Sequence, residues 1–281
     1  MSNLHTTAML VNLSISQWSA RKYDRNVSRK IEEEYNAQDA GRYNKLLIAK
    51  EGIEKIQKIA SKARIFHYTN TLPWNDNGDR ILPSANFYTY ADGVRDLKST
   101  FEKMVSKFLE VYPDLKEDAR FRLNAMFKEE DYPHVLLLPD KFNFVTSFMP
   151  IPDSSDFRVD LADTEIERIK KEIEDCRRER EVVAMKDLWS RVYTAVNHMV
   201  ERLSEEKSKF KDSLVGNIAE ICQLLPKLNI NNDANLNAMG AEIAAKLTTV
   251  EPETLRKDKD TRKEVCSSAE DILKKMEGYI K

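Results

Sequence analysis

The chain has 281 residues, of which 41% are hydrophobic and 33% are charged, with only 7 glycines. This length allows one large domain or two smaller ones, and high charge with little glycine favours long solvated helices. The 45 basic and 47 acidic residues give a formal net charge of -2. That balance excludes a global field that would hold a polyanion or an acidic membrane surface, so any nucleic-acid binding must be local.

Residues 8–18 alternate apolar and polar side chains, which predicts a half-buried strand. Over residues 27–62 apolar side chains recur at intervals of three and four residues, which predicts two helices or one interrupted helix. Residues 64–90 combine prolines, an Asn-Asp-Asn-Gly turn and many aromatic side chains. We expect a structured loop there.

The helical period resumes over residues 94–112, and Pro113 is expected to end that helix. A second helix is predicted from residue 114 to about 129. Residues 135–161 form the other extended region, with a period-two run, a proline-rich turn and a short strand over residues 157–161. Together with the first strand, these runs predict a small antiparallel sheet.

Beyond Asp163, a good N-cap, the chain continues to Pro226 with helical periodicity and no earlier proline. A single helix of that length would measure roughly 90 Å at about 1.5 Å per residue. Shorter helices are expected over residues 236–247 and 261–280, returning along the long helix. The predicted fold class is therefore α+β and predominantly helical. It has a base domain (residues 1–162) with a small antiparallel sheet, and a long helical hairpin or coiled-coil arm (residues 163–281).

Three cysteines, Cys176, Cys222 and Cys266, lie far apart and form no close pair. Neither a disulfide framework nor a Cys-x-x-Cys metal site is indicated, and reduced thiols fit a cytoplasmic protein. The first residues lack a basic segment and interrupt their apolar run with polar side chains. We therefore expect neither a signal peptide nor a membrane span.

Catalytic and cofactor motifs are missing from the sequence: it contains no GxxxxGK[ST], GxGxxG, GxSxG or HExxH string. Residues 75–79 resemble the start of a calcium loop, but Pro73 occupies the first ligand position and no Glu occupies the last. We interpret them as a polar turn. We expect no metal, no cofactor and no catalytic residue, although a cysteine and a histidine brought together by folding would escape this reasoning.

Basic and aromatic side chains alternate near the N-terminus, where two aromatic residues accompany five cations: Trp18 and Tyr23 with Arg21, Lys22, Arg25, Arg29 and Lys30. Single-stranded nucleic acid could stack on the aromatic rings while the cations, above all Arg21, Lys22 and Arg25, follow its backbone. The first turn of a solvated helix, with the tryptophan buried, accounts for the same residues and is the favoured interpretation.

A second group of aromatic residues comprises Trp74, Phe87, Tyr88 and Tyr90. Any of them left exposed by the fold would anchor a protein partner. Packing over the helices is the simpler expectation.

Three segments carry a family resemblance: LVNLSISQWSARKYDR, TLPWNDNGDRILPSANFYTY and FNFVTSFMPIPDSSDFRVDL. With them the chain resembles an uncharacterised bacteriophage and prophage family, domain of unknown function 3150, over roughly residues 8–165. In that family a strand ending in a Trp-Thr/Ser-Gly/Ala-Arg element precedes helices, and a proline-flanked aspartate segment precedes a coiled coil. These motifs are structural, so the resemblance carries over no active site. It implies a phage protein, often encoded beside a MoxR-type AAA ATPase and a von Willebrand A protein.

The leading functional hypothesis is a non-enzymatic phage interaction or assembly protein, acting as an oligomer or as an adaptor, possibly for an AAA ATPase system. Its partners would be a second copy or another protein, with no membrane involved. A single-stranded nucleic-acid-binding protein is the alternative from a different class. A phage effector that counters host defence is the third.

Overall fold

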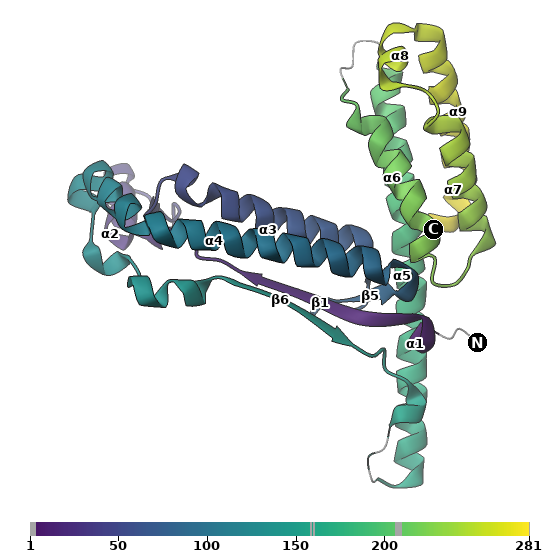
Figure 1. Cartoon of the computed structure of the whole chain (residues 1–281), viewed down its shortest axis with the longest axis horizontal. Helices are drawn as coiled ribbons and strands as arrows, with labels where there is room; N and C mark the ends of the chain where they lie inside the picture. The colour runs from purple at the N-terminus through teal and green to yellow at the C-terminus, as the bar shows by residue number, and fades with distance from the viewer. Residues whose placement is uncertain (1–3, 158, 160, 206–209, 281) are drawn as a thin grey trace. The chain divides into compact units, whose positions relative to one another are not determined.

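A computed structural model of the chain describes residues 4–157, 159, 161–205 and 210–280, and the statements below concern these residues. The described chain is mostly helical and carries a four-stranded antiparallel sheet, which confirms the predicted fold class (Figure 1). None of the described helices is both long enough and apolar enough to cross a membrane.

The chain divides into two compact units, each made of separate segments. The first unit comprises Met1–Asn12, Tyr68–Tyr90 and Ser147–Lys281, and the second comprises Leu13–His67 and Ala91–Thr146. This division differs from the predicted boundary between residues 162 and 163.

The four-stranded sheet has the strand order β4-β5-β1-β6. In it β1 (Ala8–Ser16) pairs antiparallel with β5 (Asp79–Pro83), which pairs on its other side with β4 (Leu72–Pro73). The strand β6 (Asn143–Met149) lies beside β1. The strands predicted at the N-terminus and after residue 142 are thus confirmed.

The prediction of a loop over residues 64–90 is wrong, because β4 and β5 form a hairpin within this segment. The polar turn between them is closed by Asn75, whose Oδ1 accepts hydrogen bonds from the backbone N–H groups of Asn77 and Asp79. The same turn chemistry that predicted a loop therefore connects two strands. The short strand predicted over residues 157–161 falls partly on residues 158 and 160, which lie outside the described residues.

Two long helices dominate the second unit. They are α3 (Lys50–Asn70) and α4 (Phe87–Leu123), whose end residues extend past the unit's boundary. They run antiparallel, since Gly52 of α3 lies against Leu115 of α4 while Gly93 of α4 lies against Phe66 of α3 (Figure 1).

Shorter elements precede these helices. A two-stranded antiparallel sheet pairs β2 (Arg21–Tyr23) with β3 (Asn44–Leu46), and α2 (Arg25–Tyr35) lies between them in the chain. The side chain of Asp24 caps α2 by accepting a hydrogen bond from the N–H of Val27. The sequence predicted helix through residues 44–46, where the structure has a strand.

The expected helix end at Pro113 is wrong, because α4 continues through this proline to Leu123. Proline removes one backbone hydrogen bond and normally interrupts a helix. Here Phe108 and Tyr112 before it and Ala119 after it are all buried. Tertiary packing on both sides of the proline therefore outweighs the local cost.

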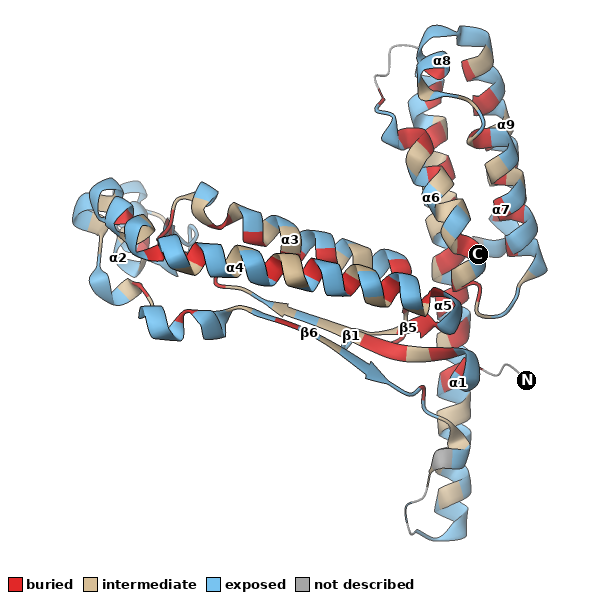
Figure 2. Cartoon of the chain, viewed as in Figure 1, coloured by how far each residue is buried: buried red, intermediate tan, exposed pale blue. Residues whose placement is uncertain are grey.

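Most of the first unit is a bundle of antiparallel helices: α5 (Asp163–Ser204), α6 (Ser213–Leu228), α7 (Ala234–Leu247), α8 (Pro252–Lys257) and α9 (Lys259–Ile280). The helix α5 packs against α6 and α9, and α7 packs against α6 and α9. The rings of Trp189 and Tyr279 stack with centroids 4.4 Å apart, while Ser204 lies beside Cys266, which makes α5 and α9 antiparallel. Figure 2 shows the buried residues of α5 concentrated where it meets these helices.

The bundle core continues into the sheet. Leu10, Leu72, Trp74 and Ile81 belong to the same hydrophobic cluster as the apolar side chains of α5. Arg191 of α5 also donates hydrogen bonds to two backbone carbonyls of residues 69–71. A division at residue 162 would therefore cut through one core.

The prediction of a single helix of roughly 90 Å is also wrong, because α5 ends at Ser204 after 42 residues, which corresponds to about 63 Å. Its end is satisfied by Arg262 of α9, whose guanidinium donates hydrogen bonds to the carbonyls of Arg202 and Leu203, at 2.8 and 2.9 Å, and of Glu205. From Ala184 onward α5 belongs to the bundle core. The expected extended rod is thus reduced to residues 163–183, here named the α5 extension.

The remaining described elements are short: the helix α1 (Leu4–Thr7) and the 3-10 helices η1 (Ser84–Asn86), η2 (Asn124–Met126), η3 (Glu129–Asp131), η4 (Val135–Leu137), η5 (Pro139–Lys141) and η6 (Ser154–Asp156).

Candidate functional site

The α5 extension carries an apolar seam with a heptad pattern. Its members follow spacings of three, four, three, four and three: Ile166, Ile169, Ile173, Cys176, Arg180 and Val183. Such a stripe is the a/d seam through which helices pair in coiled coils. Only one of its six members, Arg180, is charged.

The described residues cover the seam only in part. The three isoleucines are half-buried, as is Arg180, whereas Cys176 is exposed and Val183 is 48% exposed. From Ala184 onward the core-facing residues of α5 are instead buried in the hydrophobic cluster of the bundle. The extension therefore presents apolar surface that a partner helix would bury.

Charges flank this seam in an ordered way. With Ile166 at a, the g positions are Glu165, Glu172 and Glu179, all acidic, while the e positions Lys170 and Arg177 are basic. In a parallel coiled coil each g residue faces the e residue five positions later on the partner helix. Opposite charges would then meet, whereas an antiparallel pair would bring like charges together.

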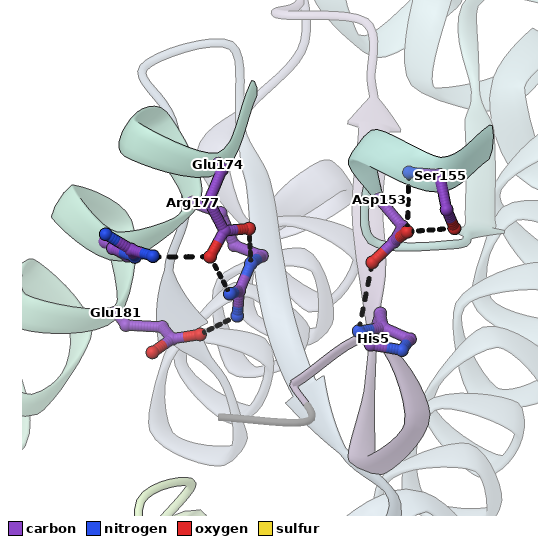
Figure 3. Close-up of polar contacts among 7 residues, drawn as sticks. His5, Asp153, Ser155, Glu174, Arg177 and Glu181 are labelled. Atoms are coloured by element: carbon purple, nitrogen blue, oxygen red, sulfur yellow. Dashed lines mark hydrogen bonds and ion pairs between the residues drawn. The ribbon is translucent and has the colours of Figure 1, made fainter. Parts of the chain in front are cut away.

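Next to the seam, Arg177 is held in a buried ion-pair cluster (Figure 3). Its guanidinium donates to Glu174 at 2.6 and 3.1 Å and to Glu181 at 2.5 Å, and both Arg177 and Glu181 are buried. Hydrogen bonds from Arg177 lower the pKa of Glu174, and those carboxylates raise the pKa of Arg177. The cluster fixes the helix surface beside the seam.

A second group in Figure 3 holds the segment before α5 and the N-terminal helix α1 together. Asp153 accepts hydrogen bonds from the hydroxyl and the N–H of Ser155, and its carboxylate lies 3.3 Å from Nδ1 of His5. The bonds from Ser155 lower the pKa of Asp153, with further lowering by the charges of His5 and Arg177. These contacts join residues on either side of the sheet strands and are structural.

In the second unit, the predicted nucleic-acid-binding residues differ in their exposure to solvent. Trp18 is buried and packs on Phe108 and Tyr112, with ring centroids 6.3 and 5.8 Å away. The ring of Trp18 is therefore not available for stacking on a base. Arg21, Lys22 and Arg25 are exposed.

Two of these cations border a polar pocket of about 400 Å³, lined by Lys22, Tyr23, Asp24, Arg25, Asn26, Lys45, Lys128, Glu130 and Asp131. Its wall contains Lys45, which is 1% exposed and lies 2.7 Å from both Asp131 and the carbonyl of Met126. Because Lys45 stands opposite Lys22 in the β2–β3 pair, Asp131 offsets the repulsion between two neighbouring lysines. The exposed aromatic ring here is Tyr23, the second aromatic residue of the segment considered for stacking.

Most of the aromatic residues predicted to form a partner surface are covered in the structure. Trp74 and Tyr90 are buried, and Phe87 is half-buried against Phe148. Burial raises the pKa of Tyr90 far above its usual value. Only Tyr88, 79% exposed, remains as an anchor.

The three cysteines lie in different environments. Cys176 is exposed, Cys266 is buried, and Cys222 is half-buried, where desolvation raises the pKa of its thiol to about 11. Among the described residues, no group of three or more His, Cys, Asp and Glu side chains is placed to hold a metal ion.

Comparison with known proteins gives no match to this chain: neither a family model, nor a curated protein, nor a solved structure matches it.

Proposed function

We propose that this chain is a non-enzymatic assembly protein that forms a parallel dimer through the α5 extensions of two copies. The carrying observation is the heptad seam of the extension, in which the isoleucines are only half-buried and Cys176 and Val183 are exposed, with acidic g and basic e positions. A parallel, in-register pair would place Glu165 beside Lys170 of the second copy.

The charge argument rests mainly on that pair. Its members form exposed ion pairs within their own helix, Glu165 with Arg168 and Lys170 with Glu167, which a partner can replace. Arg177, the other basic e residue, is already bonded to Glu174 and Glu181 of its own chain. Exposed ion pairs contribute little to affinity, so the isoleucines supply the driving force and the charges set orientation.

The seam also gives the proposal a native probe. In a parallel dimer, Cys176 at a d position faces Cys176 of the second copy, at a separation that suits a disulfide. Mild oxidation should therefore yield a covalent dimer on a non-reducing gel. Cys176→Ser should abolish that band, while Cys222→Ser should retain it because the Cys222 thiol is partly buried.

Mass measurement by light scattering after size-exclusion chromatography tests the seam itself. Ile169→Lys should convert the dimer to a monomer, because it places a charge in the apolar seam. Lys171→Glu, at the outward f position of the same helix, should leave the dimer intact. A wild-type monomer, or equal loss of the dimer in both variants, would refute the proposal.

The resemblance to the phage family extends this proposal. The dimer would act in the cytoplasm of an infected bacterium as an adaptor, with an AAA ATPase as its partner. Co-purification of the dimer with that ATPase, lost in Ile169→Lys, is the expected result.

A second function is favoured by a different observation. Arg21, Lys22, Arg25 and Lys128 make no hydrogen bond or ion pair through their side chains within the described part of the chain, and Tyr23 beside them is 41% exposed. We propose single-stranded nucleic-acid binding here as the alternative role, with Tyr23 as the stacking ring.

Fluorescence anisotropy of a labelled oligothymidine at several salt concentrations tests this alternative. Replacing Arg21, Lys22 and Arg25 with alanine should weaken binding and reduce its salt dependence. Replacing Lys55, Lys58 and Lys62 of α3 with alanine makes the same charge change elsewhere and should not. No binding at low salt would exclude this role.

A further inference from the structure

A pocket lined by cations lies within the first unit, where the end of α5 meets α8 and the beginning of α9. Its volume is about 330 Å³, and its lining includes Leu203, Ser204, Asp258, Cys266 and Glu270. Five cationic side chains complete it: Arg256, Lys257, Lys259, Arg262 and Lys263. Arg256 and Lys257 form ion pairs with Asp212 and Glu253, which do not line the pocket. The remaining Lys259, Arg262 and Lys263 still outnumber the two lining carboxylates, which favours an anion in the pocket.

The deepest of these cations is Arg262, which is 9% exposed. Its Nε and Nη2 donate to the last carbonyls of α5, which fixes the plane of the guanidinium. Within the described residues Nη1 donates no hydrogen bond, and the side chain lines the pocket. A rigid guanidinium with a donor nitrogen left over is a preorganised anion contact.

One of the two lining carboxylates, Asp258, accepts its hydrogen bonds from the start of α9 and forms no ion pair with the described lining cations. It accepts hydrogen bonds from the side chain and N–H of Thr261 and from the N–H of Asp260, and these bonds lower its pKa. At the rim, Lys263 is exposed and forms no ion pair with any residue that the structure describes.

We propose that this pocket binds a small organic phosphate, with its phosphoryl oxygens held by Nη1 of Arg262 and by the ammonium of Lys263. A guanidinium and an ammonium are the groups that bind phosphoryl oxygens by charge-assisted hydrogen bonds. The volume exceeds the needs of a bare phosphate ion and falls at the lower end of the range for small-molecule sites. The site is independent of the α5 seam.

Isothermal titration of the full chain with inorganic pyrophosphate tests the phosphoryl contact. Lys263→Glu should weaken binding about tenfold or more, because it reverses the charge of a direct contact. Lys274→Glu makes the same change on α9 outside the pocket and should leave affinity unchanged. Both substitutions lie at exposed positions, and their melting temperatures by circular dichroism verify that the fold is retained.

Two results would overturn the proposal: no binding of pyrophosphate by the wild-type chain, or the same loss in both variants, which would indicate general attraction of an anion to a basic surface.

Discussion

Arg177 is a charged side chain that the fold has removed from water. It is 6% exposed and lies between Glu174 and Glu181, of which Glu181 is 7% exposed. A buried ion pair of this kind contributes little net stability, yet breaking it leaves an uncompensated charge.

Replacing Arg177 alone, or together with Glu181, compares the cost of breaking the ion pair with the cost of removing it. Arg177→Ala should lower the free energy of unfolding by about 3 kcal/mol, because the Glu181 carboxylate is left buried without its partner. Urea denaturation followed by circular dichroism gives the value. The double variant Arg177→Met with Glu181→Leu, which removes both charges and keeps the volume, should recover most of the loss. A single variant as stable as the wild type would contradict this account.

Glycines within the helices of this chain differ in the space around them. In the second unit a Cβ on Gly93 would overlap the ring of Phe66, so α3 and α4 approach closely there. In the first unit, Gly216 of α6 has open space around it. The two positions look alike in the sequence and differ only in their packing.

The same substitution should therefore have opposite effects at these two glycines. Gly93→Ala should destabilise the chain by about 1 to 3 kcal/mol, since the Phe66 ring or the helices must move. Gly216→Ala should stabilise it by up to about 1 kcal/mol, because alanine favours the helix. Urea midpoints report both changes, and an equal shift of both variants in one direction would contradict this view of the packing.

The hydrophobic core of the C-terminal helices includes side chains from elsewhere in the chain. Leu10, Leu72, Trp74 and Ile81 come from the sheet and its hairpin, yet they belong to the cluster formed by α5 to α9. A chain cut between residues 162 and 163 would expose the surfaces that these side chains cover.

A fragment of residues 163–281 should therefore keep its helices but lose cooperative packing. We expect binding of the dye ANS and a lower, broader urea transition than for the intact chain, since the apolar surface left uncovered costs about 25 cal/mol per Å². The intact chain under the same conditions is the control. A fragment that unfolds as sharply and at the same urea concentration as the intact chain would show that residues 163–281 form an independent domain.

Local pattern determined much of this fold from the sequence alone. Helical periodicity found the regions of α7 and α9, and alternation found β1 and β6, because both patterns express which face of an element is buried. The same spacing contained the seam of the α5 extension, and its meaning became visible only when Cys176 and Val183 proved exposed.

Decisions that depend on distant residues came only from the tertiary structure. Packing carried α4 through Pro113, Arg262 of α9 capped the end of α5, and burial removed Trp18 and Trp74 from the predicted interaction surfaces. The pocket around Arg262 was likewise beyond sequence reasoning, because its cations face one cavity only after α5, α8 and α9 have packed. Periodicity thus determines what each segment becomes, whereas contacts between segments far apart in the chain determine where it ends and which side chains reach solvent.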